Sequence, residues 1–186
     1  MKKQLLSAAF LILTGCQSSS GLLEKNIRSQ LVPRVDIPRF MGDWFVIATI
    51  PTPFEKGAHN AIERYEWNEK EARVDVSFFY NNDSFTGDVE LITQKGWVQN
   101  KGEGAYWKVQ PFWPLKFDYL VIGLDPQYRW SIVGVPDRSY VWIMARTPQM
   151  SEEDYQVATQ KIEKLGYDLT KLIKVPHNGQ KPKLRD

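Results

Sequence analysis

The stretch that decides the fold runs from Ile37 to Ala48 and reads IPRFMGDWFVIA. Pro38 fixes one backbone angle upstream, and Gly42 lets the backbone pass close to another segment. The run after Gly42 is apolar and β-prone, which predicts a first strand over residues 43–50. Period-two alternation places four side chains on one face of this strand: Trp44, Val46, Ala48 and Ile50. The indole at the start of such a strand is well placed to plug one end of a closed sheet.

Composition points to a single domain with a large apolar core. The chain has 186 residues, with 7 Trp, 8 Tyr and 9 Phe, a content that suits β-structure and a pocket for an apolar guest. The formal net charge is +2, but Lys2 and Lys3 carry that excess. Without them, basic and acidic side chains balance, so no net positive field remains to attract nucleic acid.

The N-terminus reads as an export signal that ends at a cysteine. Lys2 and Lys3 precede an apolar run over residues 5–13, which is too short to span a bilayer. The following LTGC, ending at Cys16, resembles the bacterial lipobox, which implies a signal peptide over 1–15 and a lipid-modified Cys16. The alternative is an ordinary secreted protein with a chance cysteine. Gln17 stands where an aspartate favours inner-membrane retention, so we expect a lipid anchor at the periplasmic face of the outer membrane.

Cys16 is also the chain's single cysteine, which excludes disulfides and thiol catalysis from the folded domain. Residues 16–35 form a polar stretch without clear period and are predicted to be the lipidated N-terminus and a tether, although a short helical turn over 22–28 stays open. We expect the folded domain over 36–176 and a flexible tail over 177–186.

Strand-like segments separated by turn residues follow one another from Met41 onward. They are predicted over residues 43–50, 60–67, 73–80, 85–97, 105–110, 117–124, 129–135 and 140–146. Short links favour an all-β fold, an eight-stranded antiparallel up-and-down barrel, which removes both sheet edges. A barrel of this size holds side chains or one small ligand.

One helix is predicted after the barrel. Ser151 is a good N-cap, three acidic residues fill the first turn, and Gly166 ends the helix. Its single apolar stripe must be covered, and we expect it to pack on the outside of the barrel. Residues 172–175 are a candidate for a short final strand.

Three motifs in order resemble those of the lipocalins, and in detail the bacterial lipoprotein branch of that family. Gly42-Asp43-Trp44 looks like the Gly-x-Trp motif of the first strand. Residues 117–119 with 124–125 resemble the second motif, with Phe117 in place of its usual Thr. Residues 145–147 look like the third motif, and PDRSYVW over 136–142 is characteristic of the bacterial branch. The resemblance implies structural roles for four residues: Gly42, Trp44, Asp118 and Arg146. It also implies that the Arg146 guanidinium stacks on Trp44 at the closed end of the barrel.

Enzyme signatures are missing from the sequence. It contains no Gly-x-Ser-x-Gly elbow, no phosphate-binding glycine loop and no zinc-binding histidine pair at helical spacing. His59 and His177 are far apart, and both are expected to be solvated surface residues. We therefore expect a binding protein without a cofactor or metal.

Candidate ligand contacts follow from alternation. If Tyr65 and Trp67 face inward, Glu63 does so too, either as a paired or rim acid or as the contact of a polar head group. Further wall candidates are Phe78, Leu91 and Trp142, which the opposite phase would turn outward. The long loop over residues 51–57 is expected to roof the open end.

The resemblance implies binding of fatty acids or lysophospholipids, for lipid storage or transport in envelope maintenance or stress. The alternative is a structural or partner-binding envelope lipoprotein whose barrel is filled by its own aromatic side chains. Relatives suggest a homodimer, but no residue in the sequence identifies an interface.

Overall fold

The computed structural model describes residues 19–99 and 103–184. The predicted signal peptide and Cys16 lie outside these residues. No helix within the described ranges has the length and hydropathy needed to cross a membrane.

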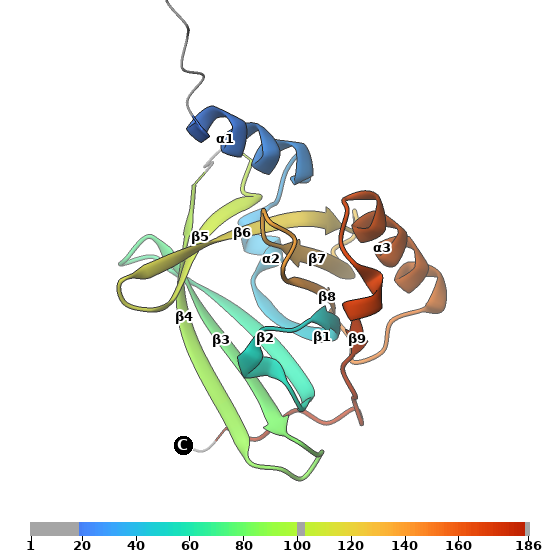
Figure 1. Cartoon of the computed structure of the whole chain (residues 1–186). Coiled ribbons are helices and arrows are strands. Elements are labelled where there is room, and N and C mark those ends of the chain that lie inside the picture. The colour runs from blue at the N-terminus through green and yellow to red at the C-terminus, as the bar shows by residue number, and fades with distance from the viewer. Residues whose placement is uncertain (1–18, 100–102, 185–186) are drawn as a thin grey trace, which may run out of the picture.

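The described part of the chain folds into the predicted antiparallel up-and-down barrel (Figure 1). Its eight wall strands are β1 (Gly42–Ile50), β2 (Ala58–Asn68), β3 (Arg73–Asn82), β4 (Val89–Val98), β5 (Tyr106–Phe112), β6 (Leu115–Leu124), β7 (Trp130–Gly134) and β8 (Val141–Ala145). Neighbours in sequence pair with one another, and β1 pairs with both β2 and β8. The sheet therefore closes on itself, because its first strand joins the second and the last wall strand.

Short helices and one further strand complete the described elements. They are α1 (Ser19–Gln30), α2 (Ile37–Phe40), η1 (Pro53–Glu55), α3 (Glu152–Lys164), η2 (Leu169–Lys171) and β9 (Ile173–Lys174). The predicted final strand is confirmed as β9, which pairs with β1 outside the closed wall.

The alternation expected for β1 is wrong beyond Val46. The pairing of β1 with β8 shifts register between Val46 and Ala48, which marks a bulge. Val46 packs in the core inside the barrel, whereas Ala48 and Ile50 pack in the core on its outer side. One extra residue in a strand turns every following side chain to the other face.

The fourth strand starts later than expected, at Val89 instead of residue 85. Residues 85–88 belong to the turn after β3, where the Asn82 amide donates to the Asp88 carbonyl at 2.9 Å. The backbone at Gly87 passes so close to β3 that an added Cβ would lie 1.8 Å from the Asn82 carbonyl oxygen. The tight turn therefore requires glycine at this position.

The helix α3 covers the outer side of the barrel, as predicted. The Asp154 amide donates to the Ser151 hydroxyl at 3.1 Å, which confirms the N-cap. Ala158 and Ile162 are fully buried in the outer core, together with side chains of β7 and β8. Figure 1 shows α3 beside these two strands.

The segment before the barrel is more ordered than a tether. Residues 19–30 form α1, and its Ile27 and Gln30 are buried. The Asn26 amide donates to the Pro136 carbonyl at 3.4 Å, and Arg138 donates to the Asn26 side-chain oxygen at 3.4 Å. A polar helix without strong periodicity is hard to predict, because tertiary contacts of this kind stabilise it.

The residues after β9 are likewise packed, so the expected flexible tail is wrong up to Lys181. We call residues 175–181, which follow β9, the C-terminal strap. His177 Nε2 donates to the Val46 carbonyl at 2.8 Å, and its ring packs on Phe45. Lys181 pairs with Asp43 at 2.6 Å. His177 is therefore not the solvated residue that the sequence predicted.

Candidate functional site

Arg146 and Trp44 meet at the closed end of the barrel. The guanidinium carbon lies 3.7 Å from the centre of the indole, which is fully buried. Arg146 also donates to the carbonyls of Asp43 at 2.9 Å and Arg39 at 2.7 Å. Gly42 adopts a φ of +92°, in the left-handed region that favours glycine, beside Arg146. These contacts close one end of the barrel.

Asp118 does not lie at this closed end. It stands on the outer face of β6, where it pairs with Lys108 at 2.6 Å and accepts from the Tyr106 hydroxyl at 2.5 Å. The buried acid near the closed end is Asp125, which follows β6 and pairs with Arg129 at 2.9 Å. Asp125, and not Asp118, is therefore the buried acid of the segment that resembles the second motif.

An aromatic layer fills the barrel above the closed end. We use this term for five side chains: Phe40, Trp44, Tyr65, Trp107 and Tyr119. Their rings contact one another at centroid distances between 5.0 and 6.3 Å. Tyr65 is buried and shares a hydrogen bond with the Tyr119 hydroxyl. Tyr65 thus faces inward as predicted, and the layer fixes its ring from several sides.

Glu63 lies inside the barrel next to this layer, with 8% of its surface exposed. The Gln94 amide donates to Glu63 Oε1 at 3.5 Å, a long and weak contact. Burial, with a further contribution from the Glu55 carboxylate, raises the pKa of Glu63 to about 8. The carboxyl is therefore mostly neutral at pH 7 unless a cation approaches it.

We call residues 51–57 the roof loop. Glu55 belongs to this loop, and its carboxylate is, after Glu63, the second acid that faces the barrel interior. It accepts from the Thr52 amide at 2.9 Å and from the Trp142 indole at 3.0 Å. Burial raises the pKa of Glu55 as well. Glu55 was not among the residues predicted from the sequence, although Thr52 and Glu55 have the spacing of a capping box. We call Glu55 and Glu63 the acid pair.

Phe78 and Trp142 lie on the inner wall, but Leu91 does not. Leu91 is 49% exposed and stands opposite Phe79, whose ring packs in the outer core. Ile92, one residue later, is the inward neighbour of Phe78. Trp67, at the far end of β2, is exposed. Placing Leu91 on the inner wall was therefore wrong, because its partner Phe79 sets that position of β4 on the outer face.

A groove of about 480 Å³ lies where β4 and β5 separate. The two strands pair only between residues 95–98 and 107–110, and the next residue in β5, Pro111, has no amide hydrogen to continue the pairing. Gln94 lines this groove and also contacts Glu63. The groove therefore reaches Gln94, which contacts Glu63 of the acid pair.

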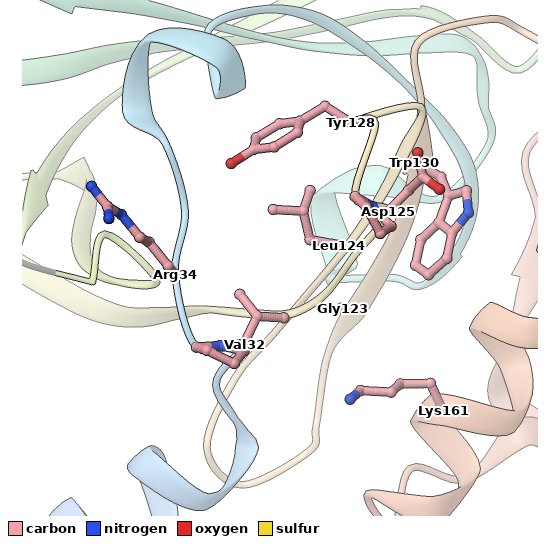
Figure 2. A pocket seen from close by; sticks show the side chains of 10 residues that line it. Val32, Arg34, Gly123, Leu124, Asp125, Tyr128, Trp130 and Lys161 are labelled. Carbon is pink, nitrogen blue, oxygen red and sulfur yellow. The ribbon is translucent and has the colours of Figure 1, made fainter.

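A second cavity, of about 340 Å³, lies outside the barrel (Figure 2). We call it the outer hollow. Val32 and Leu124 lie at its centre, Arg34 and Tyr128 lie to one side of them, and Lys161 extends toward it from α3. No residue predicted from the sequence as a ligand contact lines this hollow.

No group of three or more potential metal ligands occurs among residues 19–99 and 103–184. His59 lies at the start of β2, where its Nδ1 is 2.8 Å from the Gly57 carbonyl and its ring packs on Phe85. His177 lies in the C-terminal strap. The two histidines are therefore in separate surroundings, and both take part in packing.

Comparisons with known proteins agree with this geometry. Residues 35–177 match the model of the lipocalin-like domain. Temperature-induced lipocalin-1 of Arabidopsis thaliana is 32% identical over 161 residues, covering 82% of this chain and 85% of the relative. The outer membrane lipoprotein Blc of Escherichia coli K12 is 32% identical over 149 residues, covering 80% and 83%. Among solved structures, apocrustacyanin C1 superposes with a TM-score of 0.64 at 11% identity, covering 86% of this chain and 88% of that one. Insecticyanin from Manduca sexta has a TM-score of 0.60 at 15% identity, covering 78% and 82%.

Proposed function

The chain belongs to the lipocalin family of small hydrophobic ligand-binding proteins, and from that premise we propose that its barrel binds fatty acids or lysophospholipids. We further propose that lysophospholipids with a choline or ethanolamine head group are the better ligands. The bound lipid would be stored or transported, without chemical conversion, during envelope maintenance or stress.

The proposed preference for a choline or ethanolamine head group rests on the acid pair. Glu63 is buried beside apolar side chains, Glu55 raises its pKa, and no basic side chain contributes to that shift. A fatty acid carboxylate at this position places a negative charge in an apolar surrounding with no cation to compensate it, next to two acids whose ionised forms burial already disfavours. An ammonium head group instead compensates the charge of an ionised Glu63, so the site favours a cationic or zwitterionic lipid.

The inner wall supports an acyl chain. Val76, Phe78, Val133 and Trp142 all belong to the inner core or pack against it. Each buried methylene contributes about 0.8 kcal/mol, so a long acyl chain supplies most of the affinity. The head group then decides between ligands with equal chains.

The place of action is proposed from the N-terminus and from a relative. The sequence ending at Cys16 resembles a lipobox, and the related Escherichia coli protein is named an outer membrane lipoprotein. We propose cleavage after residue 15, lipid modification of Cys16, and anchoring to the periplasmic face of the outer membrane. Such an anchor keeps the barrel next to the membrane that supplies its ligands.

A structural or partner-binding role is the second candidate. The aromatic layer favours it, because Trp44, Tyr65 and Trp107 already fill part of the interior. In this case the barrel is a packed core, and added lipid finds no saturable site.

Displacement of a fluorescent fatty acid from the full chain distinguishes lipid binding in the barrel from a structural or partner-binding role. We expect 1-palmitoyl lysophosphatidylcholine to displace the probe at lower concentration than palmitic acid. Glu63→Gln is expected to reduce that preference about tenfold, whereas Glu66→Gln, at an exposed position of the same strand, leaves it unchanged. An unchanged preference in Glu63→Gln contradicts the head-group assignment. Absence of saturable binding contradicts lipid binding and supports the packed-core role, and mass spectrometry of the recovered lipids detects any conversion.

A further inference from the structure

The outer hollow is formed by three parts of the chain that are distant in sequence. Residues 32–34 follow α1, residues 123–130 form the end of β6 and the turn to β7, and Lys161 comes from α3. The hollow lies on the outside of the barrel and is separate from the acid pair. Val32, Leu124 and Trp130 contribute apolar surface to it.

Hydrogen-bond donors surround this apolar surface. The Asp36 amide donates to the Tyr128 hydroxyl at 2.7 Å, which leaves the hydroxyl hydrogen available to a ligand. Within the described part of the chain, Arg34 and Lys161 make no ion pair or side-chain hydrogen bond. Figure 2 shows Arg34 and Tyr128 on one side of Val32 and Lys161 on the other.

Asp125, the one acid among the described residues that line the hollow, is already satisfied. Its two oxygens accept from Arg129 Nε at 3.1 Å and Nη2 at 2.9 Å, and also from the amides of Gln127 and Arg129. The hydrogen bonds from Arg129 lower the pKa of Asp125, so it stays ionised and compensates the charge of Arg129. The uncompensated charge in the hollow is therefore positive, which suits an oxyanion.

We propose that the outer hollow binds the phosphate head group of an anionic membrane phospholipid. The phosphate oxygens accept from Lys161, with Arg34 and Tyr128 as further donors, and the glycerol carbons rest on Val32 and Leu124. This assignment rests on the proposed lipid anchor at Cys16, because the anchor brings the hollow close to a membrane. Cys16 precedes α1 by three residues, and the 12 residues of α1 span about 18 Å. Val32 follows two residues after the helix, so head groups of the anchoring membrane are within reach.

Short-chain lipids test the proposal with the full chain in neutral detergent micelles. Backbone NMR signals of Val32, Gly123 and Lys161 are followed while dihexanoyl phosphatidylglycerol, dihexanoyl phosphatidylcholine or glycerol 3-phosphate is added. We expect saturable shifts with phosphatidylglycerol at concentrations at least tenfold lower than with the other two probes. Equal binding of phosphatidylcholine overturns the assignment of an anion site. Equal binding of glycerol 3-phosphate overturns the membrane source and identifies a site for soluble phosphate esters.

Charge reversal on α3 supplies the matched control. Lys161→Glu is expected to weaken phosphatidylglycerol binding about tenfold, whereas Lys164→Glu, exposed on the same helix outside the hollow, changes it less than twofold. Equal weakening by both variants shows general attraction to a positive surface and contradicts the site. Displacement of the fluorescent fatty acid is measured on the same samples. It is unaffected by Lys161→Glu if the two sites are separate, so failure here is distinguishable from failure of lipid binding in the barrel.

Discussion

The indole of Trp142 in β8 donates a hydrogen bond to Glu55 in the roof loop at 3.0 Å. The loop is thereby attached to the inner wall that it covers, and Tyr80 adds a second attachment through the Phe54 carbonyl at 2.8 Å. The two bonds connect the loop to side chains of two different strands of the wall, β8 and β3. The roof loop is therefore held in place by two residues of the inner wall.

Loss of the hydrogen bonds that hold the roof loop is expected to raise the dissociation rate of the proposed ligand. Glu55→Ala removes the acceptor of both Trp142 and the Thr52 amide. Hydrogen bonds to a charged group contribute about 1.5–3 kcal/mol, so we expect the dissociation rate to rise at least tenfold. Stopped-flow displacement of a fluorescent fatty acid measures this rate. Trp142→Phe removes only one bond and should give a smaller increase; an unchanged rate in both variants argues against a gating roof.

Glu63 makes stability depend on pH in the absence of ligand. Its pKa is raised from 4.5 to about 8 in the folded chain, so the folded state binds a proton that the unfolded state has lost. Stability therefore falls as pH rises from 4.5 to 8, by up to about 1.4 kcal/mol per pH unit from this group. Urea unfolding at pH 5 and pH 8 measures the difference. Glu63→Gln should abolish most of this decline, and an identical decline in the variant contradicts the assignment.

Lysophospholipid binding should reverse part of this dependence. A cationic head group favours the ionised form of Glu63, so binding releases a proton below pH 8. Isothermal titration at pH 7 in buffers of different ionisation enthalpy counts that proton. We expect about one proton released by the unmodified chain and none by Glu63→Gln; release of equal amounts contradicts the contact.

The stacked pair at the closed end is expected to contribute strongly to stability. Arg146→Met removes the guanidinium from Trp44 and leaves two backbone carbonyls without their donor. We expect a loss of about 2–3 kcal/mol in the free energy of unfolding, measured by urea titration. Arg39→Met, at an exposed arginine whose guanidinium lies 4.1 Å from the centre of the Tyr128 ring, is the control and should cost less. Equal losses contradict a special role for the stack.

The C-terminal strap is expected to detach in acid. Burial lowers the pKa of His177, so the folded state disfavours the protonated ring. Stability from this group is complete above pH 6.5 and is lost as pH falls below that value. Amide hydrogen exchange at Val175, which donates to the Ile47 carbonyl, reports the detachment. His177→Gln keeps a donor without the titration and should show no such acceleration between pH 7 and pH 5.

Sequence patterns predicted the closed barrel well because strand-length segments follow one another between short turns, and strands such as β3 alternate apolar and polar side chains. Phe78 and Trp142 were placed on the inner wall from this alternation alone. It failed at Ala48, where a bulge inserts one residue, and at Leu91, which lies on the outward face of β4 opposite Phe79. Neither outcome has a local signature, since both depend on how the partner strand is aligned.

The polar features of the site were harder to predict. Glu63 was identified because it shares a strand with Tyr65, but Glu55 lies in a loop without periodicity. Its contact with Trp142 joins residues 87 positions apart, which only the folded chain reveals. Tertiary contacts likewise order α1 and the strap, whose sequences alone are mainly polar.

Closure of the barrel through β1 also has a consequence for folding kinetics. The β1 strand pairs with β8, so residues near position 45 cannot form their strand pairing until residues near position 145 are available. Contacts of such long sequence separation slow folding, typically to milliseconds or seconds for β-rich domains. A chain emerging from its N-terminus therefore presents β1 with an unpaired edge until β8 has emerged as well. We expect this interval to be the stage at which the newly made protein most needs protection from aggregation.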